Sequence, residues 1–150
     1  MVLDAVRAFF QARLSHPDEE HRPDRVAVAA CALLLEIAHA DGLGQEELDA
    51  IVRATRDDLG VPEADVRDVL RLAEDARRES VDMYQFTRLV AENFSLEQRQ
   101  RLLEAIWQVV YSDGVLTAVE SQLARRIGEL VGFQQPEIQA ARERVLARRS

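Results

Sequence analysis

Two stretches of the chain are apolar on nearly every side of a helix, and each leads into an Asp-Gly pair. They cover residues 26–37 and 102–110, and the pairs stand at positions 41–42 and 113–114. A helix that is apolar all round belongs in the interior, because none of its faces is suited to water. We therefore expect both helices at the centre of a helical bundle. The single cysteine, Cys31, falls in the first stretch and is expected to be a buried thiol.

The remaining sequence also favours helix, because apolar residues recur at helical spacing and no run alternates apolar and polar residues for long enough to form a strand. Good helix formers dominate, and the few glycines and prolines stand at helix boundaries. The expected fold is all-α, a single compact bundle of about seven to eight helices with an internal pseudo-repeat of two helix-turn-helix units. The helices are expected at residues 2–14, 24–40, 45–58, 62–78, 82–93, 96–112, 117–131 and 136–148.

Length and charge narrow the class of protein further. A chain of 150 residues is expected to form one domain, residues 1–150, in which the polar segment 15–23 with its two prolines is a mobile loop. The net charge of −8 argues against a nucleic-acid partner, which requires clustered Lys and Arg. The longest nearly apolar stretch is too short to span a bilayer, so we expect a cytoplasmic protein that is not transmembrane. No feature of the pattern specifies an oligomeric state.

Each Asp-Gly pair is followed by a glutamate near the start of the next helix: Glu47 follows Asp41, and Glu120 follows Asp113. One interpretation of these residues is purely structural. Glycine ends a helix with a positive φ angle, and a glutamate three residues after the N-cap reaches back to the helix start. Thr117 precedes Glu120 by this spacing. In this interpretation the carboxylates only cap the ends and the starts of helices.

The other interpretation is a weak divalent-cation site, for example for calcium, formed by Asp113 and Glu120 and by Asp41 and Glu47. Residues 113–120 match the second half of an EF-hand loop, in which an Asp, a Gly and a later Glu have this spacing. The first half is missing, and one Asp with one Glu supplies fewer oxygens than the roughly six to eight that calcium takes. A site at one turn would be incomplete, unless water or the other turn completes it.

Two more residues extend the set of candidate ligands at the first turn. Glu36 and His39 lie one helical turn apart just before Asp41. A lone histidine near a helix end more often bonds the chain or solvent, and this alternative stays open for His39. The loop of the first unit is one residue shorter than that of the second, so the second turn is the stronger candidate.

Several short segments carry a resemblance to a known family by their order and spacing. The chain is similar to the TerB-like tellurite-resistance proteins, in their stand-alone bacterial branch. This resemblance implies an all-helical bundle, an association with bacterial stress and tellurite resistance, and a metal or small-ligand role for the acidic turns. It implies no established enzymatic activity. The segments are residues 6–10, 34–42, 82–87 with Leu89, 97–99, 102–107 and 112–116 with Glu120.

The expected function is that of a non-enzymatic stress-response protein with a cation or small-ligand site at the two turns. The sequence has no Gly-x-Ser-x-Gly, no phosphate-binding glycine loop and no His-Glu-x-x-His, so no catalytic residue is assigned. The alternative is a protein-interaction or scaffold module, co-chaperone-like or part of a membrane-associated complex, whose acidic turns are only caps. Its docking face would be the last helix, with Arg142, Arg144, Arg148 and Arg149.

Overall fold

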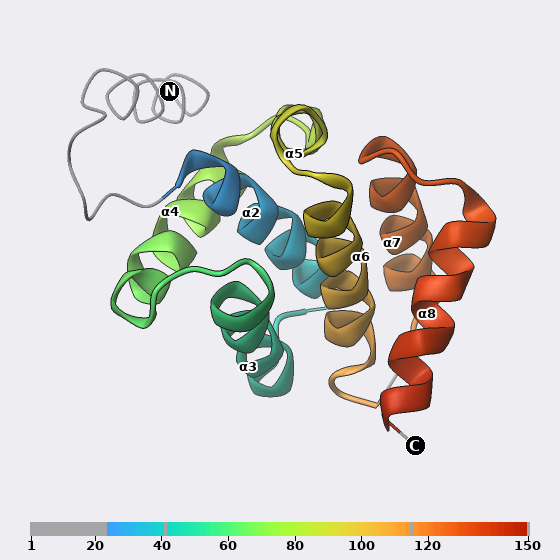
Figure 1. Ribbon diagram of the computed structural model, residues 1–150. Coiled ribbons are helices and arrows are strands. Elements are labelled where there is room, and N and C mark those ends of the chain that lie inside the picture. Colours follow the sequence, from blue (N-terminus) through green and yellow to red (C-terminus); the bar gives the residue numbers. More distant parts are fainter. Residues whose placement is uncertain (1–23, 41, 115, 150) are drawn as a thin grey trace.

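The computed structural model describes residues 24–40, 42–114 and 116–149, and within them the protein is a bundle of seven α-helices without a strand (Figure 1). The all-α prediction is therefore confirmed. The expected helix 2–14 and loop 15–23 lie outside the described residues. The helices are α2 (Arg25–His39), α3 (Gln45–Arg53), α4 (Val66–Glu79), α5 (Tyr84–Asn93), α6 (Leu96–Tyr111), α7 (Ala118–Leu130) and α8 (Gln135–Arg149).

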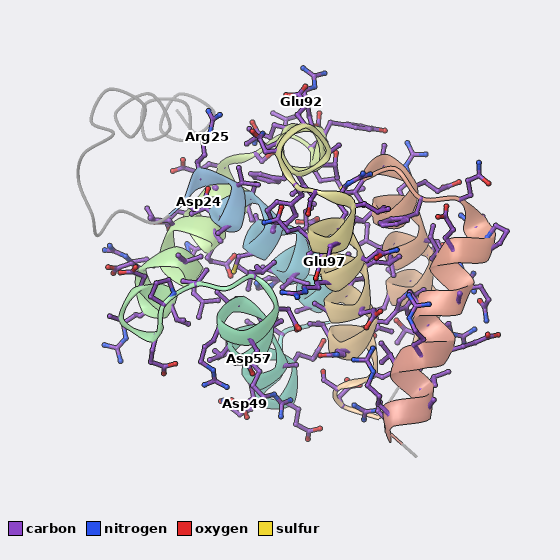
Figure 2. The ribbon with its side chains drawn as sticks, viewed as in Figure 1. Asp24, Arg25, Asp49, Asp57, Glu92 and Glu97 are labelled. Atoms are coloured by element: carbon purple, nitrogen blue, oxygen red, sulfur yellow. The ribbon has the colours of Figure 1, made fainter. Side chains whose placement is uncertain are left out.

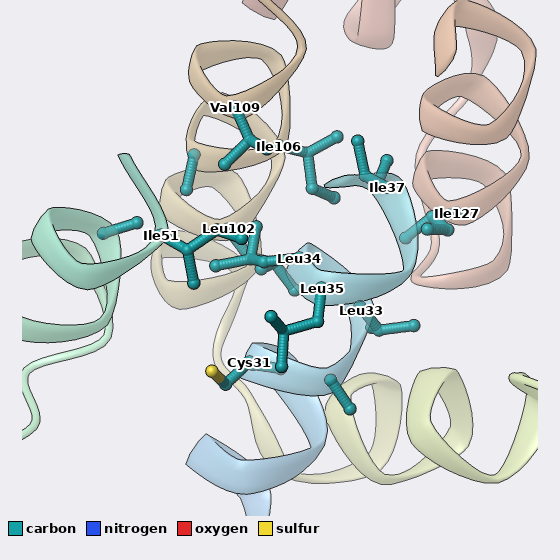
Figure 3. Close-up of a cluster of buried hydrophobic side chains, with 14 of the residues drawn as sticks. Cys31, Leu33, Leu34, Leu35, Ile37, Ile51, Leu102, Ile106, Val109 and Ile127 are labelled. Atoms are coloured by element: carbon teal, nitrogen blue, oxygen red, sulfur yellow. The ribbon is translucent and has the colours of Figure 1, made fainter. Parts of the chain in front are cut away.

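The two helices that are apolar all round form the interior, as predicted. α2 is buried along most of its length and contacts α3, α4, α5, α6 and α7. α6 is the next most buried helix and contacts α2, α3, α7 and α8. The core between them is mostly aliphatic, and Figure 3 shows side chains of α2, α6 and α7 meeting there. Charged side chains such as Asp49, Asp57 and Glu92 lie on the outside (Figure 2).

The pseudo-repeat is visible in how the helices pack. α2 with α3 forms the first helix-turn-helix unit, and α6 with α7 forms the second. The second helix of each unit contacts the central helix of the other, because α3 packs against α6 and α7 packs against α2. Both central helices run downward in the view of Figure 1, so the two turns lie toward the same side of the bundle.

Side chains of the N-cap residue fix the starts of α2, α6 and α7. Asp24 accepts a hydrogen bond from the amide of Val26 at 2.8 Å. At α6, Ser95 and Gln98 form a complete capping box, since the Ser95 hydroxyl accepts from the Gln98 amide and the Gln98 side chain accepts from the Ser95 amide. Such caps replace hydrogen bonds that the first turn of a helix cannot make internally. The observed starts therefore lie close to the predicted ones.

Two elements differ from their predictions. The helix expected over 62–78 begins with a 3-10 turn, Glu63–Asp65, and α4 itself starts at Val66. The helix expected over 45–58 ends as α-helix at Arg53, and residues Ala54–Asp58 form a π-helix. In this segment the amide of Leu59 reaches the carbonyl of Ala54 at 2.9 Å. The Thr55 hydroxyl donates to the Ile51 carbonyl at 2.7 Å and lies 3.6 Å from the Cys31 sulfur on α2. These buried contacts with the central helix fix the widened turn, and no local pattern announces it.

None of the helices in the described part of the chain is long and apolar enough to cross a membrane.

Candidate functional site

The glycines of the two Asp-Gly pairs have similar backbone conformations. Gly42 has φ +87° and Gly114 has φ +77°. Residues with a Cβ rarely adopt this backbone conformation. Space is not the reason for glycine, because a Cβ at either position would meet nothing within 4 Å. The Gly42 amide donates to the His39 carbonyl at 3.4 Å, and the Gly114 amide donates to the Tyr111 carbonyl at 3.1 Å. The central helices thus end in the same way, as the repeat predicts.

The two glutamates that follow are at equivalent positions and both are buried. Glu47 is the third residue of α3 and is 3% exposed; Glu120 is the third residue of α7 and is 0% exposed. The Gly44 amide donates to Oε1 of Glu47 at 3.2 Å. The Thr117 hydroxyl donates to Oε1 of Glu120 at 3.0 Å and accepts from the Glu120 amide at 3.2 Å. Each glutamate therefore takes part in a helix-start hydrogen bond, as the structural interpretation requires.

Two other helix starts in the same chain show that this hydrogen bond needs neither burial nor charge. Glu137 of α8 accepts from the Gln134 amide at 2.9 Å, and its side chain is exposed. Gln98 of α6 makes the same contact with a neutral amide group, and it is exposed too. A carboxylate removed from water is costly unless it is compensated. The cap therefore does not require the burial that Glu47 and Glu120 show.

Of the two turn aspartates, Asp113 is among the described residues. Asp113 is half-buried in the turn that follows α6. Asp41 lies outside the described residues. Among the residues that the structure does describe, no group of three or more His, Cys, Asp or Glu side chains is arranged to hold a metal ion. The donor set at each turn consists of carboxylate oxygens, which suit a hard divalent cation.

Glu36 and His39 belong to a different cluster. His39 Nε2 lies 2.8 Å from Oε2 of Glu74, and Arg77 Nη1 lies 3.5 Å from Oε2 of Glu36. Arg77 also binds Glu74 at 2.8 Å, so the four side chains connect α2 to α4. Partial burial opposes ionisation of Glu74, but hydrogen bonds from His39 and Arg77 outweigh it and hold the pKa of Glu74 below its usual value. Both candidates are thus engaged in holding two helices together.

The basic residues of the last helix are largely occupied by α6. Arg144 binds Glu104 at 2.9 Å, and Arg148 binds the other oxygen of the same carboxylate. Arg142 donates to the Tyr111 hydroxyl at 2.5 Å and lies over the aromatic rings of α6. Burial raises the pKa of Glu104, but the two guanidinium groups more than reverse this and hold it below its usual value. Three arginines of the face predicted for docking thus contact α6, while Arg144, Arg148 and Arg149 remain exposed.

Sequence reasoning did not find a cleft lined by residues 36, 77–78, 80–84, 86 and 123. It has a volume of about 720 Å³ and lies where α2, α4, α5 and α7 meet. Val81 and Tyr84 line it and are exposed, with 85% and 45% of their surface in water. The available signal was weak: residues 80–84 combine apolar side chains with a loop pattern. Such a loop becomes a recognisable surface only after the four helices have packed.

These features define a class of protein: an all-α bundle in which two central helices end in glycine turns, each followed by a buried glutamate. Within that class, the chain belongs to the family described as tellurite resistance protein TerB, whose model matches residues 27–143. The match extends from the first turn of α2 into α8 and includes both acidic turns. No curated protein and no solved structure matches the chain.

Proposed function

We propose that this TerB-family protein is a non-enzymatic bacterial stress-response protein, of the tellurite-resistance type, that binds a divalent cation weakly at its two acidic turns. The ligands assigned are Asp113 and Glu120 at the second turn, and Asp41 and Glu47 at the first. Glu36 and His39 are left out because their side chains hold α2 against α4. No catalytic role is assigned, because the sequence has none of the catalytic motifs named above.

The burial of Glu47 and Glu120 is the observation that carries this proposal. Both side chains are at most 3% exposed, whereas Gln98 and Glu137 make comparable helix-start hydrogen bonds from exposed positions. A bound cation would compensate a buried carboxylate more strongly than a neutral hydrogen-bond donor does. The family match includes both turns and supports the tellurite-resistance type.

The chemistry favours a hard cation held with modest affinity. Carboxylate oxygens are the preferred ligands of calcium and magnesium, whereas zinc usually takes histidine or cysteine as well. One aspartate and one glutamate give a turn at most about four oxygens, fewer than calcium normally takes. Water or backbone carbonyl groups must supply the rest, so we expect weak binding at each turn.

Thermal unfolding of the full chain tests the proposal directly. Calcium, magnesium, manganese and zinc are titrated separately, each with and without EDTA. A cation at about a hundredfold its dissociation constant should stabilise the fold by about 2.7 kcal/mol if the unfolded chain does not bind it. For a domain of this size, that corresponds to a rise in Tm of about 5–11 °C.

Three substitutions separate cation binding from capping. Glu120→Gln and Asp113→Asn should remove the response to cation, because they delete a charge but keep an oxygen that accepts hydrogen bonds. Glu137→Gln is the matched control, since it changes an exposed glutamate at a helix start by the same atoms. The control should keep the full response.

The proposal is wrong if no cation shifts the Tm of the wild-type protein. It is also wrong if Glu137→Gln lowers the shift as much as Glu120→Gln, because the response would then reflect net charge alone. In either case the carboxylates act as caps, and the alternative of an interaction or scaffold module takes over.

A further inference from the structure

The side of the bundle that carries the two acidic turns also exposes apolar side chains. Figure 1 shows the starts of α3 and α7 and the end of α8 on this lower side, which we call the turn side. Of the seven large apolar side chains exposed in the described part of the chain, four stand at these three points. They are Leu43, Leu116, Val119 and Leu146, with 37–56% of their surface in water. Exposed apolar side chains that gather on one side mark a contact surface.

The repeat places an aliphatic residue at a corresponding point of both units. Leu43 follows Gly42 directly, and Leu116 comes two residues after Gly114. Each leucine lies just before the N-cap residue of the next helix. A loop that faces only water gains nothing from an apolar side chain. Two exposed leucines in equivalent loops therefore point to a use outside the bundle.

The two turn segments are also strongly acidic. Residues 40–52 and 112–124 together contain six Asp or Glu and no Lys or Arg. Four of the six are the ligands assigned to the cation sites, and the other two, Glu46 and Asp49, are exposed. Without cations, this charge repels any anionic surface. Two divalent cations carry four positive charges, so their binding would offset most of it.

A cation held at either turn keeps coordination positions for a ligand from outside the protein. One aspartate and one glutamate supply at most about four of the roughly six to eight oxygens that calcium takes. Phosphate oxygens suit the same hard cations as carboxylate oxygens do. A phospholipid headgroup can therefore complete the coordination shell, while the apolar region below the headgroups receives the leucines beside each turn.

We propose that the turn side docks on an anionic lipid surface when its two turns hold divalent cations. Docking of this kind depends on the cation binding proposed above and adds its partner. The cations bridge turn carboxylates to lipid phosphates, and Leu43, Leu116 and Val119 enter the interface between headgroups and acyl chains. Arg149, exposed in the last turn of α8, adds an attraction to the lipid phosphates.

A lipid surface fits these observations better than a peptide does. A peptide needs a groove or a pocket that holds its side chains. None of the four exposed aliphatic residues lines the clefts of about 260, 350 and 720 Å³. They stand instead on three separate segments of one side, which is the arrangement that insertion into a lipid interface requires.

Flotation of the full chain with vesicles provides the test. The vesicles contain equal amounts of phosphatidylglycerol and phosphatidylcholine, or phosphatidylcholine alone. Each kind is mixed with the protein in calcium, magnesium, manganese or EDTA. We expect the wild type to float with the mixed vesicles when a divalent cation is present, and to stay in solution in EDTA or with phosphatidylcholine alone. Glu120→Gln should abolish this flotation, and Glu137→Gln should keep it.

Three substitutions examine the apolar contact. Leu43→Gln, Leu116→Gln and Val119→Gln should each weaken vesicle binding about fivefold, because each prevents an exposed apolar side chain from being buried in the interface. All three positions are exposed, and circular dichroism checks that the variants are folded. Leu96→Gln is the matched control, since Leu96 is 55% exposed at the start of α6, at the other end of that helix from the turn. The control should bind vesicles like the wild type.

The rise in Tm with cation is measured on the same proteins and separates the two proposals. It should be unchanged by the substitutions of apolar residues, because these residues are not cation ligands. A wild type whose Tm rises but which does not float refutes lipid docking and leaves the cation site standing. A wild type that shows neither effect refutes both.

Three other results would also refute lipid docking. The first is flotation in EDTA, or with phosphatidylcholine alone, as strong as with cation and phosphatidylglycerol. The second is an equal loss of binding in Leu96→Gln and Leu116→Gln, because the turn side would then have no special part. The third is self-association on addition of cation, seen by sedimentation without flotation, since the surface then contacts a second copy of the chain.

Discussion

Gly128 of α7 is a position where two effects of known size oppose each other. A Cβ added there would lie 2.8 Å from Cδ1 and 2.9 Å from Cγ1 of Ile138, and 3.2 Å from Cδ1 of Leu103. Gly→Ala in a helix interior ordinarily stabilises by about 1 kcal/mol. Overpacking a filled core costs about 1–3 kcal/mol. Ile138 and Leu103 are each 1% exposed, so neither side chain has room to move away.

We therefore expect Gly128→Ala to destabilise the protein by about 1 kcal/mol, because the steric cost exceeds the gain in helix propensity. Urea unfolding measures this change, and the Tm should fall by about 2–4 °C. Ile138→Val supplies the control, since it deletes the nearest atom and alone costs about 0.5–1.5 kcal/mol. The double variant should lose less stability than the two single changes added together. Additive losses, or stabilisation by Gly128→Ala alone, would refute the argument.

Two further predictions concern titratable side chains. Burial raises the pKa of Cys31 to about 12. The native thiol should therefore resist a maleimide at neutral pH and react only in denaturant. Rapid labelling of the native protein would show that α2 is not central. The pKa of Glu74 is held below its usual value of 4.5, so its contribution to stability is present above that pH and is lost as the pH falls through the lower, folded-state value. Glu74→Gln should therefore destabilise the protein more at neutral pH than in acid, which urea unfolding at the two pH values measures. An equal loss of stability at both would show that the Glu74 carboxylate is not stabilised by His39 and Arg77.

The fold was predictable because its signals are local. Ser95 with Gln98, and Thr117 before α7, set helix starts within a turn of sequence, and the observed helices begin there. The π-helix Ala54–Asp58 was not predictable in this way. Its geometry depends on Thr55, which contacts Cys31 on another helix. A widened turn that is fixed by a distant contact leaves no periodic pattern of its own.

The candidate site was predictable in its residue types but not in its environment. Spacing identified Glu47 and Glu120, and it correctly marked them as helix-start residues. It also grouped Glu36 and His39 with the first turn, because neighbours in sequence were the only neighbours visible. Their actual partners lie on α4. The partner of the basic last helix was not predictable either, because Glu104, which binds Arg144 and Arg148, lies on α6, about 40 residues earlier in the sequence.

The third residues of α3, α7 and α8 differ in burial, and these three helices also differ in how they pack. α3 packs against α6 and α7 packs against α2, and the third residue of each of these two helices is buried. α8 packs on the outer side of α6 and α7, and its third residue, Glu137, is exposed. A neutral glutamine makes a comparable helix-start contact at α6 from an exposed position. Capping by itself therefore does not call for the buried, charged residues Glu47 and Glu120, and their burial is the observation on which the cation proposal rests.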